Sequence, residues 1–334
     1  ADIAAVLKKR DIPGASVAVA IGGRIAWAKG FGVTEEGGTQ PVQADTLFEA
    51  ASVSKAITAL GALRLVESRK LALDVPIAKY SRTLKLPGQD VITLRQLLSH
   101  TSGLSTRGFP GYPRGVVTLP TVEQILAGKS PANSKPVVLD GEPGKYSYSG
   151  GGYTVVQQLV MDATGKPFAQ AMSELVLGPL GMKDSTFEQP LPTNRFAQAA
   201  TGHNSRARPV PSKWHVYPEL AAAGLWTTAP DLARYLIGVQ KAYAGQAGAL
   251  IGQDTARDML RAQSKDGPGL GVYVYGDDAT GSFVHDGSNN GYRTRILATK
   301  AAGGRALAIM TNSNDGDDVF KPVQDLVDAA FIRK

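Results

Sequence analysis

In this 334-residue chain, a serine and a lysine three residues apart are the strongest candidates for a nucleophile and its base. Ser52 and Lys55 open a segment that predicts a helix, so they would share one face, one turn apart. A serine hydroxyl is a poor nucleophile until a nearby base takes its proton, and a partly desolvated lysine can be that base. The helix N-terminus would favour negative charge on Ser52. The alternatives are a helix N-cap for Ser52 and an exposed surface lysine for Lys55.

Two further motifs follow in the chain. The run 143–153 contains Tyr148 among glycines, and residues 284–288 read Val-His-Asp-Gly-Ser in a strand-like region. Together with Ser52-x-x-Lys55, these motifs resemble those of the penicillin-recognising serine hydrolases. Within that superfamily the chain is most similar to the class C β-lactamase-like branch, which includes esterases, D-aminopeptidases and D,D-carboxypeptidases. Three other stretches agree with this branch: Leu97–Leu104, Leu180–Thr186 and Gly224–Ala233.

The resemblance implies a role for each matched residue. Ser52 is the expected nucleophile, Lys55 its base, and the phenol of Tyr148 the group that relays a proton to the leaving group. The alternative for Tyr148 is an ordinary half-buried aromatic. The oxyanion hole is expected from the backbone N–H groups of Ser52 and Ser288. Gly287 would allow its strand to approach the substrate closely.

The histidines divide into one candidate for chemistry and three for structure. His285 takes the place of the lysine in the family's Lys-Thr-Gly motif, where it can polarise the motif tyrosine or orient the substrate. A hydrogen-bonded structural histidine is the alternative. His100 is interpreted as structural. With His203 and His215 it shows no metal-ligand spacing, and the chain has no cysteine. We therefore expect neither a metal site nor a cofactor.

Two substrate-binding positions depart from the family pattern. Gly150 stands where the family usually has an asparagine that holds the substrate's amide, and glycine cannot supply that bond. Asp286 stands where a hydroxyl residue usually helps to bind a substrate carboxylate, which an aspartate would repel. Both changes favour neutral esters or substrates with an amine. The alternative is that Asp286 points away and pairs with Arg293 or Arg295.

The sequence thus predicts a serine hydrolase that acts through a covalent acyl-enzyme on a small-molecule ester, amide or lactam, with a carboxylesterase as the first choice. A β-lactamase, a D,D-carboxypeptidase and a D-aminopeptidase are alternatives within the class. An acyltransferase would use the same intermediate. From another class, the alternative is a non-catalytic penicillin-binding-like sensor, against which the joint presence of Ser52, Lys55 and Tyr148 argues.

The elements that must position these residues are strands at both ends of the chain and helices between them. Around the Gly22-Gly23 hairpin signal and near the C-terminus, we expect strands at Ala15–Ile21, Arg24–Phe31, Gly271–Tyr275, Arg293–Thr299 and Ala306–Thr311. We expect helices at Ser54–Glu67, Leu94–Ser99, Tyr153–Ala163, Pro167–Val176, Asp231–Lys241 and Val319–Phe331, the last capped by Asp317 or Asp318.

This order predicts an α+β fold of the β-lactamase/transpeptidase-like type. Its antiparallel sheet is built from both chain ends, flanked by helices, and interrupted by an inserted helical region. Residues 1–75 and 210–334 are expected to form the sheet region, residues 76–209 the helical region, and the cleft between them the active site. The stretch Gly103–Gly115 is expected to be a long surface loop at the rim of the cleft.

Composition fits this interpretation and narrows the partners. The net charge is +7, but apart from Lys8–Arg10 the basic residues are dispersed, which argues against nucleic acid. No window approaches the roughly 20 apolar residues of a membrane span.

The chain has no initiator methionine and no leader, so we expect a processed or trimmed form. The family resemblance favours a periplasmic or secreted protein, with a cytoplasmic one left open. Oligomeric state is not fixed by the sequence.

Overall fold

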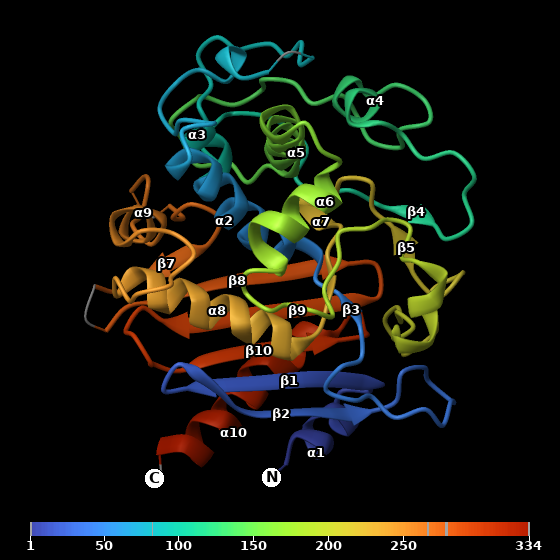
Figure 1. Ribbon diagram of the computed structural model, residues 1–334. Coiled ribbons are helices and arrows are strands. Elements are labelled where there is room, and N and C mark those ends of the chain that lie inside the picture. The colour runs from blue at the N-terminus through green and yellow to red at the C-terminus, as the bar shows by residue number, and fades with distance from the viewer. Residues whose placement is uncertain (1, 82, 266, 278–279, 333–334) are drawn as a thin grey trace.

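The computed structural model describes residues 2–81, 83–265, 267–277 and 280–332 (Figure 1). The strands are β1 Gly14–Ile21, β2 Arg24–Gly32, β3 Phe48–Glu49, β4 Tyr112–Pro113, β5 His215–Val216, β6 Trp226–Thr227, β7 Tyr273–Tyr275, β8 Ser282–Asn289, β9 Tyr292–Thr299 and β10 Ala306–Thr311. The helices are α1 Ile3–Lys9, α2 Ser54–Glu67, α3 Leu94–Leu98, α4 Val122–Ala127, α5 Gly150–Thr164, α6 Phe168–Met172, α7 Leu220–Ala223, α8 Ala229–Tyr243, α9 Gln253–Met259 and α10 Phe320–Ile332. Shorter turns are η1 Ala51–Val53, η2 Ile77–Lys79, η3 Ser173–Leu177, η4 Thr193–Gln198 and η5 Gly316–Val319.

The centre of the molecule is a six-stranded sheet in the order β2-β1-β10-β9-β8-β7. The neighbouring strands pair antiparallel, and they come from residues 14–32 and 273–311. Gly22 and Gly23, which join β1 to β2, both have positive φ angles, of 65° and 73°. Such angles suit the tight hairpin turn that twisted strands favour. The expected α+β fold, with a sheet built from both ends of the chain, is confirmed.

Helices cover both faces of this sheet (Figure 1). Strand β1 is buried on both sides, and its side chains alternate between two hydrophobic clusters. Val17 and Val19 pack with residues of α1 and α10, whereas Ala18 and Ala20 belong to the larger cluster that contains α8. The small alanine side chains leave room for α8 to lie against the sheet.

Helix α2 lies between the sheet and the upper helices (Figure 1) and is buried almost all round. Every residue from Ser54 to Leu63 is buried. A helix that is apolar on all sides belongs inside a large core, and α2 is therefore held rigidly by its surroundings. Ile57, Leu60 and Leu63 of this helix are in the central cluster, and the partly buried Val66 packs against it. No described helix is long and apolar enough to cross a membrane.

Several expected boundaries are wrong for local reasons. Helix α5 begins at Gly150 instead of Tyr153, because Ser149 Oγ caps it by accepting the N–H of Gly152. The expected helix Pro167–Val176 divides into α6 and the π-helical turn η3. Asp317 and Asp318 lie inside the 3₁₀ turn η5 rather than cap the C-terminal helix, which begins at Phe320.

Candidate active site

The serine and lysine of the first motif are in direct contact. Lys55 Nζ lies 3.0 Å from Ser52 Oγ and 2.7 Å from the carbonyl oxygen of Ala222 in α7. Lys55 is 2 % exposed, so the alternative of a surface lysine is wrong. Ser52 lies in η1, one turn before α2, and no side-chain cap bond is made at the start of either element. The N-cap alternative for Ser52 is therefore wrong as well.

The backbone around Ser52 is packed closely against strand β8. Ala51 has a φ of +50°, a left-handed conformation that non-glycine residues seldom adopt. Strand β8 presses against this turn at Gly287, where an added Cβ would lie 2.3 Å from Ala50 O and 3.2 Å from Ser52 N. Only glycine fits there without displacing the strand. The expected oxyanion-hole residues, Ser52 and Ser288, therefore lie on neighbouring elements and line one cavity.

Tyr148 lies beside Lys55 and contacts it through its ring. Lys55 Nζ is 5.1 Å from the ring centroid of Tyr148 and 5.7 Å from that of Tyr153, within the range of cation–π interactions. Tyr148 is half-buried and lines the same cavity as Ser52. Tyr153 is fully buried, and its hydroxyl donates to Leu98 O. The second motif is thus brought to the first.

His285 is buried in β8 and lines the cavity. Its Nδ1 lies 2.7 Å from Asp286 O, so the neutral ring that donates there has an unprotonated Nε2. Burial, helped by the charge of Lys55, lowers the pKa of His285 to about 4. The ring lies 5.8 Å from that of Tyr273. His285 is therefore neutral around neutral pH, and it is both hydrogen-bonded and placed at the cavity wall.

Asp286 faces the cavity and is also paired. Arg295 Nε and Nη2 donate to its two carboxylate oxygens at 2.8 and 2.7 Å. This bidentate pair is the one that the alternative interpretation of Asp286 named, although the residue still lines the cavity. The pairing of strands β8 and β9 brings the two side chains together, because Asp286 lies directly opposite Arg295 in this hairpin. Balanced charge at this position weakens the expected repulsion of carboxylates.

The cavity that joins these residues has a volume of about 730 Å³. Its wall consists of Ser52, Arg107, Gly108, Tyr148, Tyr273, Tyr275, Val284, His285, Asp286, Gly287, Ser288, Arg293, Arg295, Asp317 and Phe320. Arg107 and Gly108 belong to the loop expected at the rim. Gly150 is not part of this wall: it is buried at the start of α5, where its N–H donates to Thr106 O at 2.7 Å. The structure therefore brings together every expected site residue except Gly150, with Lys55 behind the wall.

Some residues of the site were not found from the sequence. The carbonyl of Ala222 has no sequence signature, because any residue supplies one. Tyr273 and Tyr275 alternate along β7, and this period of two could have suggested a shared face. Arg107 is exposed in the rim loop, where no pattern marks it. Among the described residues, no group of three or more His, Asp or Glu side chains is arranged to hold a metal ion.

Comparison with known proteins identifies the family. The β-lactamase family model matches residues 1–330 of the chain. The chain belongs to the β-lactamase family. It is 30% identical over 332 residues to esterase EstB of Burkholderia gladioli, an alignment that covers 89% of this chain and 79% of that protein. It is 32% identical over 233 residues to a β-lactamase of Providencia stuartii, covering 69% of this chain and 56% of the relative. This family member is accordingly a serine hydrolase.

Solved structures share its fold. A β-lactamase/D-alanine carboxypeptidase from Pseudomonas syringae superposes with a TM-score of 0.74 at 20% identity, over 94% of this chain and 92% of that one. SurE with D-Leu gives a TM-score of 0.76 at 24% identity, over 98% of this chain and 74% of that one. At these identities the likeness establishes the fold alone. The β-lactamase/transpeptidase-like architecture expected from the sequence is confirmed.

Proposed function

We propose that this hydrolase is a carboxylesterase-type enzyme in which Ser52 is the nucleophile, Lys55 its base and Tyr148 the proton relay. One observation carries the proposal. Lys55 Nζ is buried 3.0 Å from Ser52 Oγ, and Ser52 opens onto the 730 Å³ cavity. A nucleophile within hydrogen-bond reach of a base, at the wall of a cavity, is the arrangement that acyl transfer requires.

The contacts of Lys55 support its role as base. Lys55 Nζ donates to both Ser52 Oγ and Ala222 O, at 3.0 and 2.7 Å. To act as base, the amine has to give up one proton. Its bond to Ala222 O then fixes the nitrogen, and the freed lone pair faces the Ser52 hydroxyl. Lys55 then takes the proton while Ser52 Oγ attacks the substrate carbonyl. Tyr148, beside the same nitrogen, gives its phenol proton to the leaving alcohol and takes the proton held by Lys55 in return.

The negative charge that develops on the substrate's carbonyl oxygen needs hydrogen-bond donors close to Ser52. The backbone N–H groups of Ser52 and Ser288 are the proposed donors, since β8 lies directly against η1. Water then attacks the acyl-enzyme carbonyl and gives one proton to Lys55, which passes it to Ser52 Oγ as the acid leaves. His285, neutral and buried beside Tyr273, is proposed to orient the leaving group.

The first choice of substrate class is supported by one comparison. The esterase of Burkholderia gladioli aligns over most of both chains. We therefore place small esters first among esters, amides and lactams. A β-lactamase or peptidase is the second candidate, because the cavity wall contains three arginines against two aspartates and Asp286 is paired with Arg295. That excess of positive charge suits a substrate carboxylate.

Active-site labelling combined with a substrate panel tests the proposal. A fluorophosphonate should label the wild type and fail on Ser52→Ala, while circular dichroism shows that the variant is folded. Ser102→Ala is the matched control, because this buried serine lies outside the cavity wall. The panel comprises aryl esters, D-amino-acid amides and a chromogenic cephalosporin, with and without an added alcohol as acyl acceptor. Equal labelling of Ser52→Ala would overturn the nucleophile, and turnover of the cephalosporin above that of the esters would favour the second candidate.

A further inference from the structure

His100 is built into the site although the sequence gives it only a structural role. It comes two residues after the end of α3, and its side chain is 2 % exposed. Its φ of +56° lies in the left-handed region, which non-glycine residues adopt only where the surrounding structure imposes it. It does not line the cavity that holds the proposed reacting groups. Any effect of His100 on the reaction must therefore act through a neighbour.

That neighbour is Tyr148, which His100 contacts on three sides. The N–H of Ser147, just before Tyr148, donates to His100 O at 2.8 Å. The N–H of Ser149, just after it, donates to His100 Nδ1 at 3.1 Å. Between these bonds, the Tyr148 ring lies against the imidazole, with centroids 4.3 Å apart and planes 32° apart. The backbone on both sides of Tyr148 and the face of its ring are thus fixed by one residue.

The imidazole has to be neutral for this arrangement. Nδ1 can accept the Ser149 N–H only through its lone pair, so the ring proton is on Nε2. Burial, helped by the nearby charge of Lys55, holds the pKa of His100 well below its usual value. A charged ring would lose the Ser149 bond and repel Lys55. The neutral ring instead packs between Tyr148 and Tyr153, whose centroid is 5.3 Å away.

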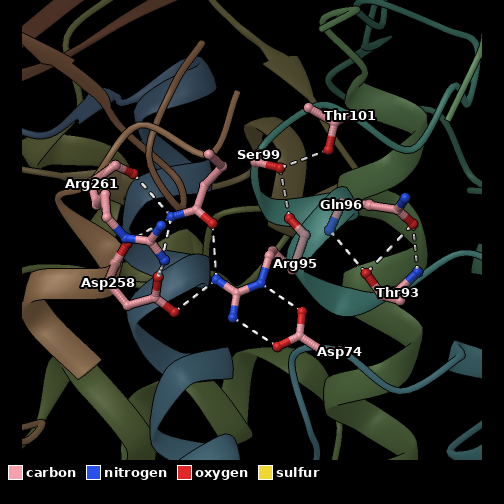
Figure 2. Close-up of polar contacts among 9 residues, drawn as sticks. Asp74, Thr93, Arg95, Gln96, Ser99, Thr101, Asp258 and Arg261 are labelled. Carbon is pink, nitrogen blue, oxygen red and sulfur yellow. Dashed lines mark hydrogen bonds and ion pairs between the residues drawn. The ribbon is translucent and has the colours of Figure 1, made fainter. Parts of the chain in front are cut away.

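The segment that carries His100 is itself anchored from several directions (Figure 2). Thr93 and Gln96 form a capping box at the start of α3. Arg95 donates to both oxygens of Asp74 at 2.6 and 2.8 Å and to Asp258 at 2.7 Å. Ser99 Oγ, next to His100, donates to Arg95 O at 2.8 Å (Figure 2). These bonds make the end of α3 a fixed support.

We propose that His100 is a positioning residue that sets the orientation of Tyr148 relative to the Ser52–Lys55 pair. It holds the backbone on both sides of Tyr148 and supports one face of its ring, while Lys55 Nζ lies 5.1 Å from the centroid of the same ring. The inference rests on the proposed role of Tyr148 as proton relay. It assigns no contact between His100 and the substrate.

A graded pair of variants with a matched control tests this inference. His100→Asn retains a short side-chain acceptor for Ser149 N–H and tolerates the left-handed backbone, but it lacks the ring. His100→Ala lacks both. With an aryl ester, we expect kcat to fall by about tenfold in His100→Asn and about a hundredfold in His100→Ala, with KM changed less than about threefold. His203→Asn is the control, since this buried histidine bonds Glu36 N and Asn312 O away from the cavity and should affect stability without affecting kcat.

A double-mutant cycle separates positioning from mere loss of stability. If His100 acts through Tyr148, His100→Asn should reduce kcat in the wild-type background and change it less than about twofold in the Tyr148→Phe background. Thermal melts and endpoint titration of Ser52 with a fluorophosphonate give the folded, competent fraction of each variant. An equal loss of kcat in both backgrounds would overturn the inference.

The remaining outcomes distinguish this inference from the proposed function. Unchanged kcat in His100→Asn and His100→Ala, with Tyr148→Phe inactive, would overturn the positioning role alone. Full activity of Tyr148→Phe would overturn the relay and the positioning role together. Full activity of Ser52→Ala would overturn the proposed function itself.

Discussion

At the scale of single residues, the charge of Asp286 is balanced inside the cavity that it faces. Arg295 binds both of its carboxylate oxygens through two charge-assisted hydrogen bonds. The site therefore presents an ion pair to the substrate where the sequence alone suggested a lone carboxylate. Removing either partner should expose the other charge to the substrate.

Opposite changes at this pair should have opposite effects on charged substrates. Asp286→Asn leaves Arg295 unpaired, so kcat/KM for a carboxylate-bearing cephalosporin should rise by about fivefold. Arg295→Gln leaves Asp286 unpaired, and the same ratio should fall by about fivefold. Steady-state kinetics on a neutral aryl ester, which should change less than about twofold, provides the control. A uniform loss on both substrates in both variants would mean that the pair serves structure alone.

His285 should make the folded protein less stable in acid. Its folded-state pKa of about 4 lies below its ordinary value because burial and Lys55 disfavour the charged ring. Between about pH 4 and 6.5 the unfolded chain therefore binds a proton that the folded protein rejects, so the free energy of unfolding rises with pH across this window. The full contribution is present above about pH 6.5 and is lost as the pH falls towards 4.

Urea unfolding of wild type and His285→Gln from pH 4 to 7 measures this contribution. The free energy of unfolding of the wild type minus that of the variant should increase by about 3 kcal/mol across the window, since glutamine does not titrate. Contributions of other titrating groups cancel in this difference. A difference that stays constant with pH would show that His285 binds its proton equally in both states.

At the scale of elements, the site depends on how closely β8 approaches η1. Gly287 has no side chain, and a Cβ there would lie 2.3 Å from Ala50 O, so the strand would have to move. The movement would separate the N–H groups of Ser52 and Ser288, the proposed oxyanion hole. A change of one methyl group should therefore affect both stability and catalysis.

Gly287→Ala should lower the free energy of unfolding by about 2 kcal/mol through overpacking. It should also lower kcat for an aryl ester by at least about a hundredfold, because one misplaced oxyanion donor costs about that much. Gly108→Ala controls for adding a methyl group to the cavity wall without overpacking, since that group would meet nothing within 4 Å and the φ of Gly108 is not positive. Denaturant unfolding and steady-state kinetics check both effects. Normal kcat in a destabilised Gly287→Ala variant would separate this glycine from the oxyanion hole.

At the scale of the whole molecule, one hydrophobic cluster runs through the sheet and the helices above it. It includes Ala18 and Met310 of the sheet, Ile57 of α2 and Val156 of α5. Trp226 stands in the same cluster, 5.9 Å from the ring of Tyr292 in β9. The division into residues 1–75 with 210–334 and residues 76–209 stays a prediction, but this continuous core couples the two parts.

We expect that coupling to appear as a single unfolding transition. Tryptophan fluorescence and far-ultraviolet circular dichroism should give the same midpoint in urea, because no boundary in the core allows one part to melt alone. Trp27→Phe removes the reporter on edge strand β2 and leaves the buried Trp214 and Trp226, which report on the core. Two separated midpoints, or a midpoint that depends on the probe, would show that the two regions unfold independently.

The sequence by itself determined the features that depend on local interactions. Helix α2 has the predicted bounds Ser54–Glu67, and the hairpin of β1 and β2 turns at Gly22 and Gly23 as expected. Apolar periodicity and glycine turns act within a few residues, so they can be recognised without the fold. The spacing of Ser52 and Lys55 is local in the same sense, and it brought the two side chains into contact even though Ser52 lies in η1 rather than in α2.

Only the tertiary structure decided what surrounds that pair. The acceptor that holds Lys55 is a carbonyl 167 residues away, and backbone carbonyls have no sequence signature. His100 reaches Tyr148 across the gap between α3 and α5 through ring packing and a bond to a backbone N–H, neither of which leaves a spacing pattern. Gly150 follows the motif tyrosine closely yet lies outside the cavity, because the start of a helix turns it inward. Contacts between distant segments depend on packing of the whole core, which a local pattern does not encode.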